Sequence, residues 1–440
     1  MIRNKHIFTI LFLILASLSF GQTNLSLEEA IKVAIENNFN LDISDKQIEI
    51  AQNNDSWARA GRAPIIDLVG GINNNLVNDQ NPASFLQGTY FAGAANVGVN
   101  VQWLAYGGGR VKILKSQLEK LVSQEALNKE NNVHLLIRDV IQAYRLVQFQ
   151  EARSFLLQEN LKLSKDQLEY EETKRAFGAS NSYNITQFEV AYLTDSISWV
   201  NQINLIETAK RQLNIVLNNP EYEAFEVTKN FSVSLESLDK EKLHDILNEE
   251  NYTLKTITTL QELNAINTRL EQSFDKPSVN ISAGIGFTEN AFKFFADNPN
   301  TGLPFELQFA NRTNYNVGAN ASWNLYDGGL QSSNIQNARV QEEITALSFL
   351  EAKASLNNQL DLLIENYNSQ KDLIALNDEQ VKLAEINLEM TQERFKNGQL
   401  TSLDFRNVQN QLLLALFNKA NSIYDFIVTK SEIDFLVGKY

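Results

Sequence analysis

The chain of 440 residues carries a net charge of −15 at neutral pH and contains no cysteine. So acidic a chain is a poor partner for the phosphate backbone of nucleic acids, and without cysteine it cannot form disulfides, thiolate metal sites, a cysteine nucleophile or a lipid-anchored cysteine. His134 and His244 lie in helix-like segments without an H-E-x-x-H pattern, which predicts packed or solvated helix histidines. We therefore expect no enzyme activity, no metal and no cofactor.

The first 21 residues have the pattern of a secretory signal peptide. Arg3 and Lys5 precede an apolar run from Ile7 to Leu18, and Ser19-Phe20-Gly21 supplies a small-x-small cleavage site. The apolar run has about 12 residues, well short of the roughly 20 that a membrane-spanning helix needs. We predict that the protein leaves the cytoplasm. No other segment has a long apolar run, so any membrane contact of the mature protein falls to β-strands or to its surface.

An internal repeat organises the rest of the chain. The segment that begins at Trp103 aligns with the one that begins at Trp323, at a shift of 220 residues, and Gly178 meets Gly398 at the same shift. Upstream the shift is 213, where Pro64 meets Pro277. The chain is therefore one unit used twice, and the difference between the shifts lies in a loop.

Each repeat contains one very long predicted helix. Residues 111–177 and 331–397 contain neither Gly nor Pro and are rich in helix-forming residues. Helices of this length suit only an extended bundle or coiled coil. Each is followed by a turn and a second helical run, and each repeat opens with a shorter helix. The first short helix has Ser26 and Glu29 at capping-box spacing, and the second begins near Asp239.

Between the short and long helices the apolar pattern changes to a period of 2, which predicts two strands per repeat. The alternating apolar or small residues are Ile66, Leu68, Gly70 and Ile72, then Val97, Val99, Val101 and Trp103, then Val279, Ile281, Ala283 and Ile285, and last Tyr315, Val317, Ala319, Ala321 and Trp323. Polar loops are expected at about 73–91 and 288–314.

Such strands fit either a half-buried sheet in a soluble domain or a transmembrane β-barrel. Four strands cannot close a barrel, and an open sheet in lipid would leave backbone groups unpaired, so a barrel requires several chains to pool their strands. Two, three or four copies would satisfy this condition equally well.

Three motifs resemble the TolC-type outer membrane efflux protein family. They are the opening that runs from Leu25 to Ile31 with Glu36-Asn37-Asn38, the Trp-x-x-Tyr-x-Gly-Gly strand end of both halves, and the helix turn from Arg394 to Gly398 followed by Ser402-Leu403-Asp404. The resemblance implies a mainly α protein with membrane β-structure. Its form would be a homotrimer whose twelve-stranded β-barrel, four strands per chain, is continued by a long α-helical coiled-coil barrel.

The function that the resemblance implies is passive export, as the outer membrane duct of a tripartite efflux or type I secretion system. Its implied partners are a periplasmic adaptor protein, an inner-membrane transporter and outer membrane lipid, with no nucleic acid. The chain would lie in the outer membrane and extend into the periplasm. The alternative is an extended periplasmic or surface coiled-coil protein with a structural or adhesive role and no pore. Such a protein would need a separate head domain, for which the repeat leaves no residues.

The resemblance also implies positions for a site. The tip turns at Gly178 and Gly398 correspond to the narrow periplasmic end of the duct, where Asp404, Asn184 and Asn407 would line the constriction. Asp404 also has capping-box spacing with Thr401, so a helix cap is an equally good interpretation. At the strand-to-helix junctions, Gly108, Gly109, Gly328 and Gly329 are expected to serve backbone geometry and to bind no ligand.

The expected segments follow from these assignments. They are the signal peptide at 1–21, a short helix at 22–62, a β-hairpin at 63–106, the long helix with tip turn and return helix at 107–219, a linker or equatorial segment at 220–238, the second short helix at 239–276, the second β-hairpin at 277–326, and the second long helix with its tip and return helix at 327–440.

Overall fold

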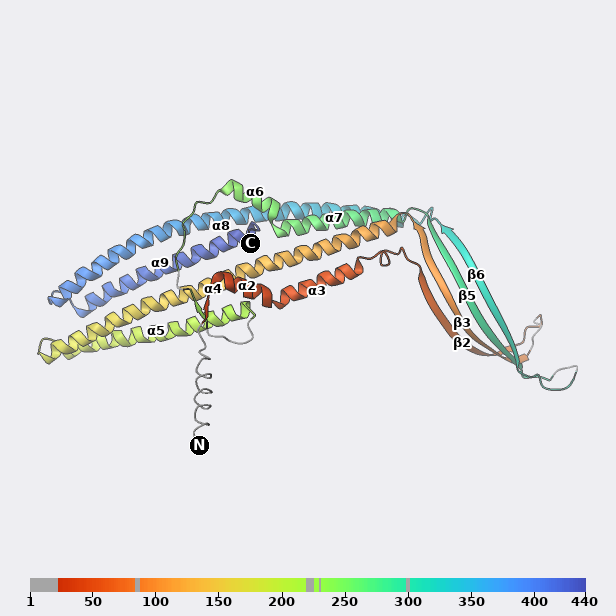
Figure 1. The fold of residues 1–440 in the computed structure, drawn as a ribbon, viewed down its shortest axis with the longest axis horizontal. Helices are drawn as coiled ribbons and strands as arrows, with labels where there is room; N and C mark the ends of the chain where they lie inside the picture. The colour runs from red at the N-terminus through yellow and green to blue at the C-terminus, as the bar shows by residue number, and fades with distance from the viewer. Residues whose placement is uncertain (1–22, 84–87, 219–224, 229–230, 298–300) are drawn as a thin grey trace, which may run out of the picture. The chain divides into compact units, whose positions relative to one another are not determined.

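The structure is a computed structural model that describes residues 23–83, 88–218, 225–228, 231–297 and 301–440. The predicted signal peptide lies outside these residues. The described chain is mainly helical, with one four-stranded antiparallel sheet and one short parallel strand pair (Figure 1). It divides into a helical unit, from the described residues up to Asp45 with Leu127–Lys255 and Leu350–Tyr440, and a sheet unit, Lys46–Ala126 with Thr256–Phe349.

No helix among the described residues is both long and apolar enough to cross a membrane.

The two repeats produce matching pairs of helices. The long helices are α4 (Arg110–Ala176) and α8 (Leu330–Lys396), each of 67 residues, and the return helices are α5 (Ser182–Val216) and α9 (Ser402–Leu436), each of 35 residues. The predicted long helices are thus confirmed to within a residue at each end. Because no Gly or Pro interrupts them, nothing in the backbone chemistry stops helix propagation until the tip turn.

In the helical unit these four helices lie in the order α8, α9, α4, α5. Lys419 of α9 pairs with Asp378 of α8 at 2.7 Å, and the rings of Tyr424 of α9 and Phe149 of α4 stack with centroids 4.8 Å apart. On the other side of α4, Gln202 of α5 donates to the side-chain oxygen of Gln150 at 2.7 Å. Helices α8 and α5 are therefore the outer members of the row, except near the tips, where α5 also contacts α9 and α8.

Each predicted short helix is in fact two helices. The pairs are α2 (Leu27–Asn37) with α3 (Phe39–Asn54), and α6 (Lys240–Glu250) with α7 (Tyr252–Ser273). Asn38 and Asn251 separate them at equivalent positions of the two repeats, both with extended backbone. Their side-chain oxygens accept hydrogen bonds from the backbone of Leu41 and Leu254, so each asparagine caps the following helix instead of continuing the preceding one.

Two buried tyrosines of the long helices form hydrogen bonds with the predicted linker, residues 220–238, and with the short strand that pairs with it. Strand β4 (Phe225–Val227) lies in this linker and pairs in parallel with β1 (Thr23–Leu25). Tyr144 of α4 is 1% exposed and donates to the backbone oxygen of Leu25 at 2.8 Å, while its hydroxyl accepts from the backbone N–H of Thr228 at 3.1 Å. In the second repeat Tyr367 of α8 is also 1% exposed and donates to the backbone oxygen of Glu236.

The sheet unit contains strands β2 (Ile65–Asp79), β3 (Gly88–Gly107), β5 (Ser278–Phe294) and β6 (Gln308–Ser322). Their order is β2-β3-β5-β6, so the two hairpins meet where β3 pairs with β5, and β2 and β6 form the edges. The loops predicted at about 73–91 and 288–314 are wrong in extent. Much of both ranges is strand, because the asparagine-rich strand ends satisfy their backbone groups in the antiparallel ladder.

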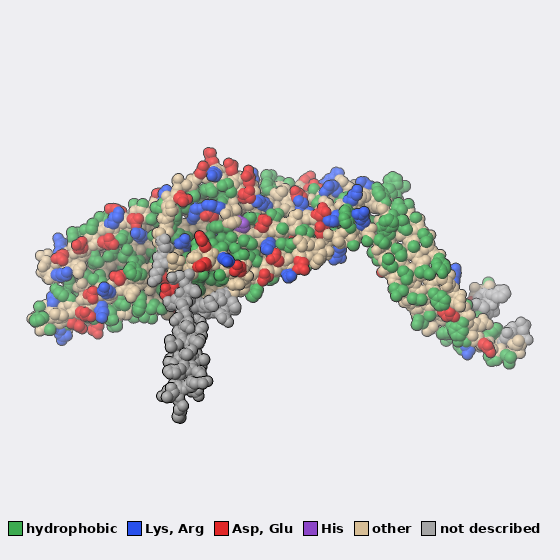
Figure 2. Space-filling model, viewed as in Figure 1, with side chains coloured by type: hydrophobic (Ala, Val, Ile, Leu, Met, Phe, Trp, Pro, Cys, Tyr) green, Lys and Arg blue, Asp and Glu red, His purple; other side chains and the backbone are tan. Residues whose placement is uncertain are grey.

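The sheet has two chemically different faces. Cross-strand rows such as Leu68, Val99, Ile285 and Tyr315 place apolar side chains on one face, and rows such as Asp67, Asn100, Gly284 and Asn316 place polar ones on the other. Figure 2 shows hydrophobic side chains over much of the strands, whereas charged side chains of both signs are spread over the helices. The predicted alternation is therefore confirmed.

A tryptophan at the end of each hairpin forms a hydrogen bond with the backbone just before the start of that hairpin. The indole N–H of Trp103 donates to the backbone oxygen of Arg62 at 2.9 Å, and that of Trp323 donates to the backbone oxygen of Asp275 at 2.8 Å. Both acceptors stand two residues before the proline that precedes a hairpin. The same contact therefore occurs twice in the chain.

Proline in the middle of a long helix tests the assignment. Leu146→Pro in α4 and Ile364→Pro in α8 should each lower stability by about 3 kcal/mol or more per chain, because proline removes a backbone donor and clashes with the preceding turn. Chemical denaturation followed by helical circular dichroism measures the loss. Leu146→Ala and Ile364→Ala are the matched controls, since they remove the side chain alone. Equal losses for proline and alanine would contradict a continuous helix.

His134 should make stability sensitive to acid. It is 7% exposed, its Nε2 lies 2.9 Å from the hydroxyl of Tyr252, and its Nδ1 has no hydrogen-bond partner among the described residues. Burial lowers the pKa of His134 from 6.5. The unfolded chain therefore binds the proton first, so this contribution to stability is complete above pH 6.5 and declines as the pH falls toward the folded pKa.

The test compares unfolding of the wild type and His134→Gln between pH 8 and pH 5. The wild type should lose more stability than the variant as the pH falls below about 6.5, the ordinary histidine pKa. Parallel curves would show that His134 does not titrate in this way.

Candidate functional site

The two helical tips are built alike. Gly178 and Gly398 have φ of 75° and 73°, a left-handed conformation that glycine adopts without strain. The backbone N–H of Ala179 donates to the oxygen of Lys174 at 2.8 Å, and that of Gln399 donates to the oxygen of Arg394 at 3.0 Å. These are Schellman-type ends, which satisfy the last carbonyls of α4 and α8 and turn the chain back.

The return helices begin with different caps. Asn181 accepts from the backbone N–H of Asn184 at 2.9 Å. Thr401 forms a full capping box with Asp404, whose carboxylate accepts from the hydroxyl of Thr401 at 2.7 Å and from its backbone N–H at 3.0 Å. The Thr401 hydroxyl, followed by its backbone N–H, lowers the pKa of Asp404, so the carboxylate stays ionised at neutral pH.

The three residues predicted for the constriction differ in exposure. Asp404 and Asn407 are exposed, and Asn184 is half-buried. Among the described residues no hydrogen bond joins the three side chains to one another. The structure thus gives Asp404 a capping role, while a role in a pore stays a prediction.

Beneath the tips lies a buried aromatic cluster. Phe188 of α5, Phe395 of α8 and Phe405 of α9 are 3%, 5% and 0% exposed. The ring of Phe395 is 5.7 Å from that of Phe188 and 5.3 Å from that of Phe405, measured between centroids. Phe395 therefore packs the end of the second long helix against both return helices.

A buried polar network, farther from the tip turns than this cluster, connects the two repeats. Arg406 of α9 makes a two-pronged ion pair with Asp195 of α5, with contacts of 2.5 and 2.6 Å. Ser164 of α4 donates to Asp195, also at 2.5 Å. Gln409 donates to Asn160 at 2.9 Å and to Ser164 at 2.9 Å. The side chains of Asp195 and Arg406 are 5% and 18% exposed, so water screens the pair little.

Sequence reasoning missed this network. At the shift of 220 residues Asp195 meets Ala415 and Arg406 meets Thr186, so each has an uncharged counterpart in the other repeat. Other charged residues do too, such as Glu207, which meets Ile427. The sequence therefore carries no signal specific to this pair, and only the structure shows that Asp195 and Arg406 meet.

The junction glycines adopt left-handed backbone conformations. Gly108 and Gly109 have φ of 63° and 88°, and Gly328 and Gly329 have φ of 76° and 91°. A Cβ at Gly108 would lie 2.5 Å from the backbone oxygen of Ser273, which is too close for any other residue. At the second junction Asp327 accepts from the backbone N–H groups of Gly329 and Gln331 at 2.9 and 2.8 Å, so it caps the start of α8.

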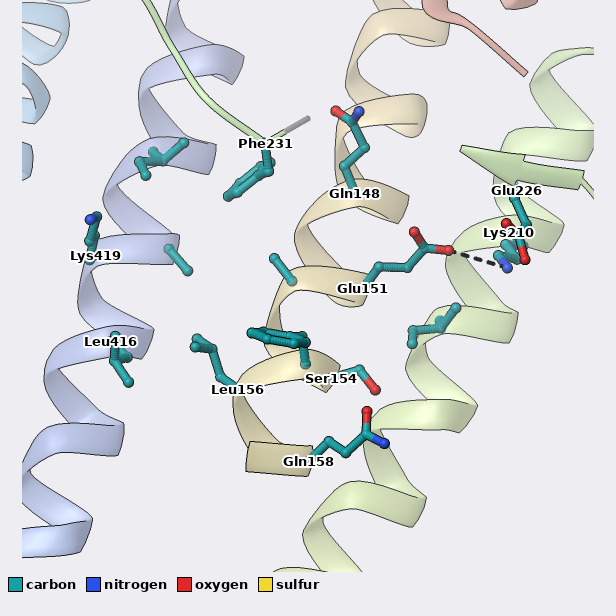
Figure 3. A pocket seen from close by; sticks show the side chains of 15 residues that line it. Gln148, Glu151, Ser154, Leu156, Gln158, Lys210, Glu226, Phe231, Leu416 and Lys419 are labelled. Carbon is teal, nitrogen blue, oxygen red and sulfur yellow. Dashed lines mark ion pairs between the residues drawn. The ribbon is translucent and has the colours of Figure 1, made fainter. Parts of the chain in front are cut away.

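The helical unit also has a pocket of about 690 Å³ between α4, α5 and α9, bordered by Glu226 and Phe231 (Figure 3). Apolar side chains such as Leu156 and Leu416 line it together with the Glu151–Lys210 ion pair, whose charged atoms are 3.3 Å apart. No histidine occurs among the described residues that line it.

Comparison with known proteins shows which family and which solved structures the chain is similar to. Residues 251–439 match the family model described as "Outer membrane efflux protein". No curated protein sequence matches the chain.

Solved structures share the fold. A membrane protein from Pseudomonas aeruginosa has a TM-score of 0.76 and 13% identity, with 94% of this chain and 90% of that chain covered. The Campylobacter jejuni CmeC outer membrane channel has a TM-score of 0.74 and 13% identity, covering 94% and 85%. The Vibrio cholerae outer membrane protein VceC has a TM-score of 0.70 and 15% identity, covering 94% and 96%. At these identities the likeness concerns the fold.

The resemblance to outer membrane efflux proteins is thereby confirmed. It rests on sequence over most of the second repeat and on fold over nearly the whole chain.

The buried network yields a prediction about stability. Arg406→Met leaves Asp195 as an uncompensated buried charge and should cost about 3–5 kcal/mol. The double variant Arg406→Met with Asp195→Leu should recover part of this loss, because it removes both charges. Chemical denaturation of the wild type, both single variants and the double variant gives the coupling. Strictly additive losses would show that the two residues do not interact.

Proposed function

We propose that this protein is the outer membrane channel of a tripartite efflux or type I secretion system, through which substrates leave passively. The observation that carries the proposal is the sheet, which has one apolar face, one polar face and two open edges. Lipid suits the first face and water the second, and the edges require further strands. The family match of the second repeat supports the same function.

Further copies of this chain supply the missing strands. Three copies, as the resemblance implies, would give a homotrimer with a twelve-stranded barrel in the outer membrane. An assembly in which β6 of one copy pairs with β2 of the next leaves no edge exposed to lipid. A coiled-coil protein without a pore would not need this alternation of faces.

The exposed side chains of the helical unit also support a closed assembly of several copies. Most exposed large apolar side chains of its four long helices lie on α5 and α8, the outer members of the row, whereas α9 exposes Leu403 and Leu414 and the α4 segment of this unit exposes Phe155. Those on α5 are Tyr183, Val190, Leu193, Ile197, Val200, Ile203, Leu205 and Ile215, and those on α8 are Leu350, Leu362, Leu373, Leu376, Leu383, Ile386 and Met390. Packing α5 of one copy against α8 of the next buries both stripes.

The remaining partners follow from this role. A passive duct has no energy source of its own, so an inner-membrane transporter drives export and a periplasmic adaptor protein connects the two. Asp404, Asn184 and Asn407 line the narrow end at the tips. There one Asp404 per copy forms a ring of carboxylates that attracts cations and repels anions.

Channel recordings in planar bilayers test the function directly. The protein should form ion-conducting pores with a preference for cations at neutral pH. Mutual repulsion in the ring opposes the effect of the Thr401 cap on the pKa of Asp404, and the preference should fall as the pH drops through the carboxyl titration. Asp404→Asn should weaken the preference at neutral pH, because it removes the charge and keeps the shape.

Asp327→Asn is the matched control, since Asp327 also caps a helix, the long helix α8, but lies at the strand-to-helix junction. It should leave selectivity unchanged. Absence of any conductance from folded wild-type protein would contradict the channel. Unchanged selectivity in Asp404→Asn, together with lower thermal stability, would leave Asp404 with the capping role alone.

A further inference from the structure

The polar face of the sheet is unusually rich in carboxamides. Strand register places on this one face Asn73, Asn75, Asn96, Asn100, Gln102, Asn280, Asn290, Gln308, Asn314, Asn316 and Asn320. The opposite face has asparagine at Asn74, Asn78 and Asn311, toward the loop ends of the strands. The amides therefore gather on the face that the proposed channel turns toward water.

Charge is sparse on the same face. Among its described strand residues, Asp67, Asp79 and Arg312 are the charged ones, and all three belong to the edge strands β2 and β6. The inner strands β3 and β5 contribute amides, hydroxyls, glycine and apolar residues to it. A solute moving along this face meets hydrogen-bonding groups far more often than charges.

Glycines bring the amides close to the sheet. A Cβ built on Gly284 would lie 3.0 Å from the side-chain oxygen of Asn100 and 2.8 Å from that of Asn316. Asn100 and Asn316 stand on either side of Gly284 in one cross-strand row. Their amides thus lie over the glycine from both sides, in the space that any other residue would occupy. Gly71 and Asn96 repeat the arrangement, with 3.2 Å between the Cβ position and the amide oxygen.

A carboxamide both donates and accepts hydrogen bonds and carries no net charge. A hydroxyl group also donates and accepts hydrogen bonds. A neutral solute with many hydroxyl groups can therefore replace its hydrogen bonds to water with hydrogen bonds to successive amides along these rows. Anions and cations, by contrast, would lose hydration without gaining an opposite charge. The chemistry of the face therefore favours uncharged, hydroxyl-rich solutes.

We propose that this carboxamide face binds saccharide chains during their passage, with Asn100 and Asn316 over Gly284 as its central contact. The proposal rests on the channel function and names a cargo class for it. Saccharides fit because their hydroxyl groups are dense, neutral and regularly spaced.

Single-channel recording with maltohexaose tests the proposal. In the wild type, maltohexaose added to both sides should interrupt the current reversibly. The double variant Asn100→Ala with Asn316→Ala should shorten these interruptions roughly fivefold or more, because two hydrogen-bonding side chains are lost. The matched control, Val99→Ala with Val317→Ala, changes the neighbouring residue of each strand on the opposite face and should leave the interruptions unchanged.

A second measurement needs no variant. A glutamate hexapeptide should interrupt the wild-type current less than maltohexaose at equal concentration. A conducting pore that ignores maltohexaose, or that responds equally in the wild type and the asparagine variant, would overturn the saccharide proposal alone. A folded protein that forms no pore would overturn the channel function on which it rests.

Discussion

The unpaired edges of β2 and β6 are the constraint on which the rest of the structure depends. Each edge strand is 15 residues long and presents backbone groups that nothing in its own sheet satisfies on the outer side. In water such edges invite aggregation, and in lipid they are prohibitively costly. In the proposed channel these edges lie in lipid, where water is not available as an alternative partner. Further copies of the chain would then supply the strands that pair with them.

The helical unit meets the same requirement with different chemistry. Its helices satisfy their own backbone groups, so its edges are marked by apolar side chains along α5 and α8. Within the chain, the row is held by polar contacts that pass from one repeat to the other, and the Arg406–Asp195 pair is the most buried of the ion pairs between them. The outer surfaces of α5 and α8, by contrast, carry exposed apolar side chains, which the proposed assembly would bury between copies.

Much of this architecture could be predicted from the sequence, because it follows from local rules. The long helices are visible as runs without Gly or Pro, and the strands as alternation around Val99 and Ile285. Strand ends were harder, since the run from Asn73 to Asn75 has the composition of a loop and becomes strand only because β3 supplies a partner. The breaks at Asn38 and Asn251 were missed for a related reason: asparagine is tolerated within helices, and only its capping contact shows that it ends one. The pairing of β3 with β5 and the meeting of Asp195 with Arg406 depend on contacts between repeats, which periodicity cannot encode.

The most direct test of the account is the number of chains in the detergent-solubilised protein, measured by native mass spectrometry or by light scattering corrected for detergent. The account predicts a stable complex of three chains that keeps its β-structure. A stable monomer with intact β-structure would contradict it, because the edges of β2 and β6 would then persist without partners. A dimer or tetramer would keep the pooled strands and overturn the number three.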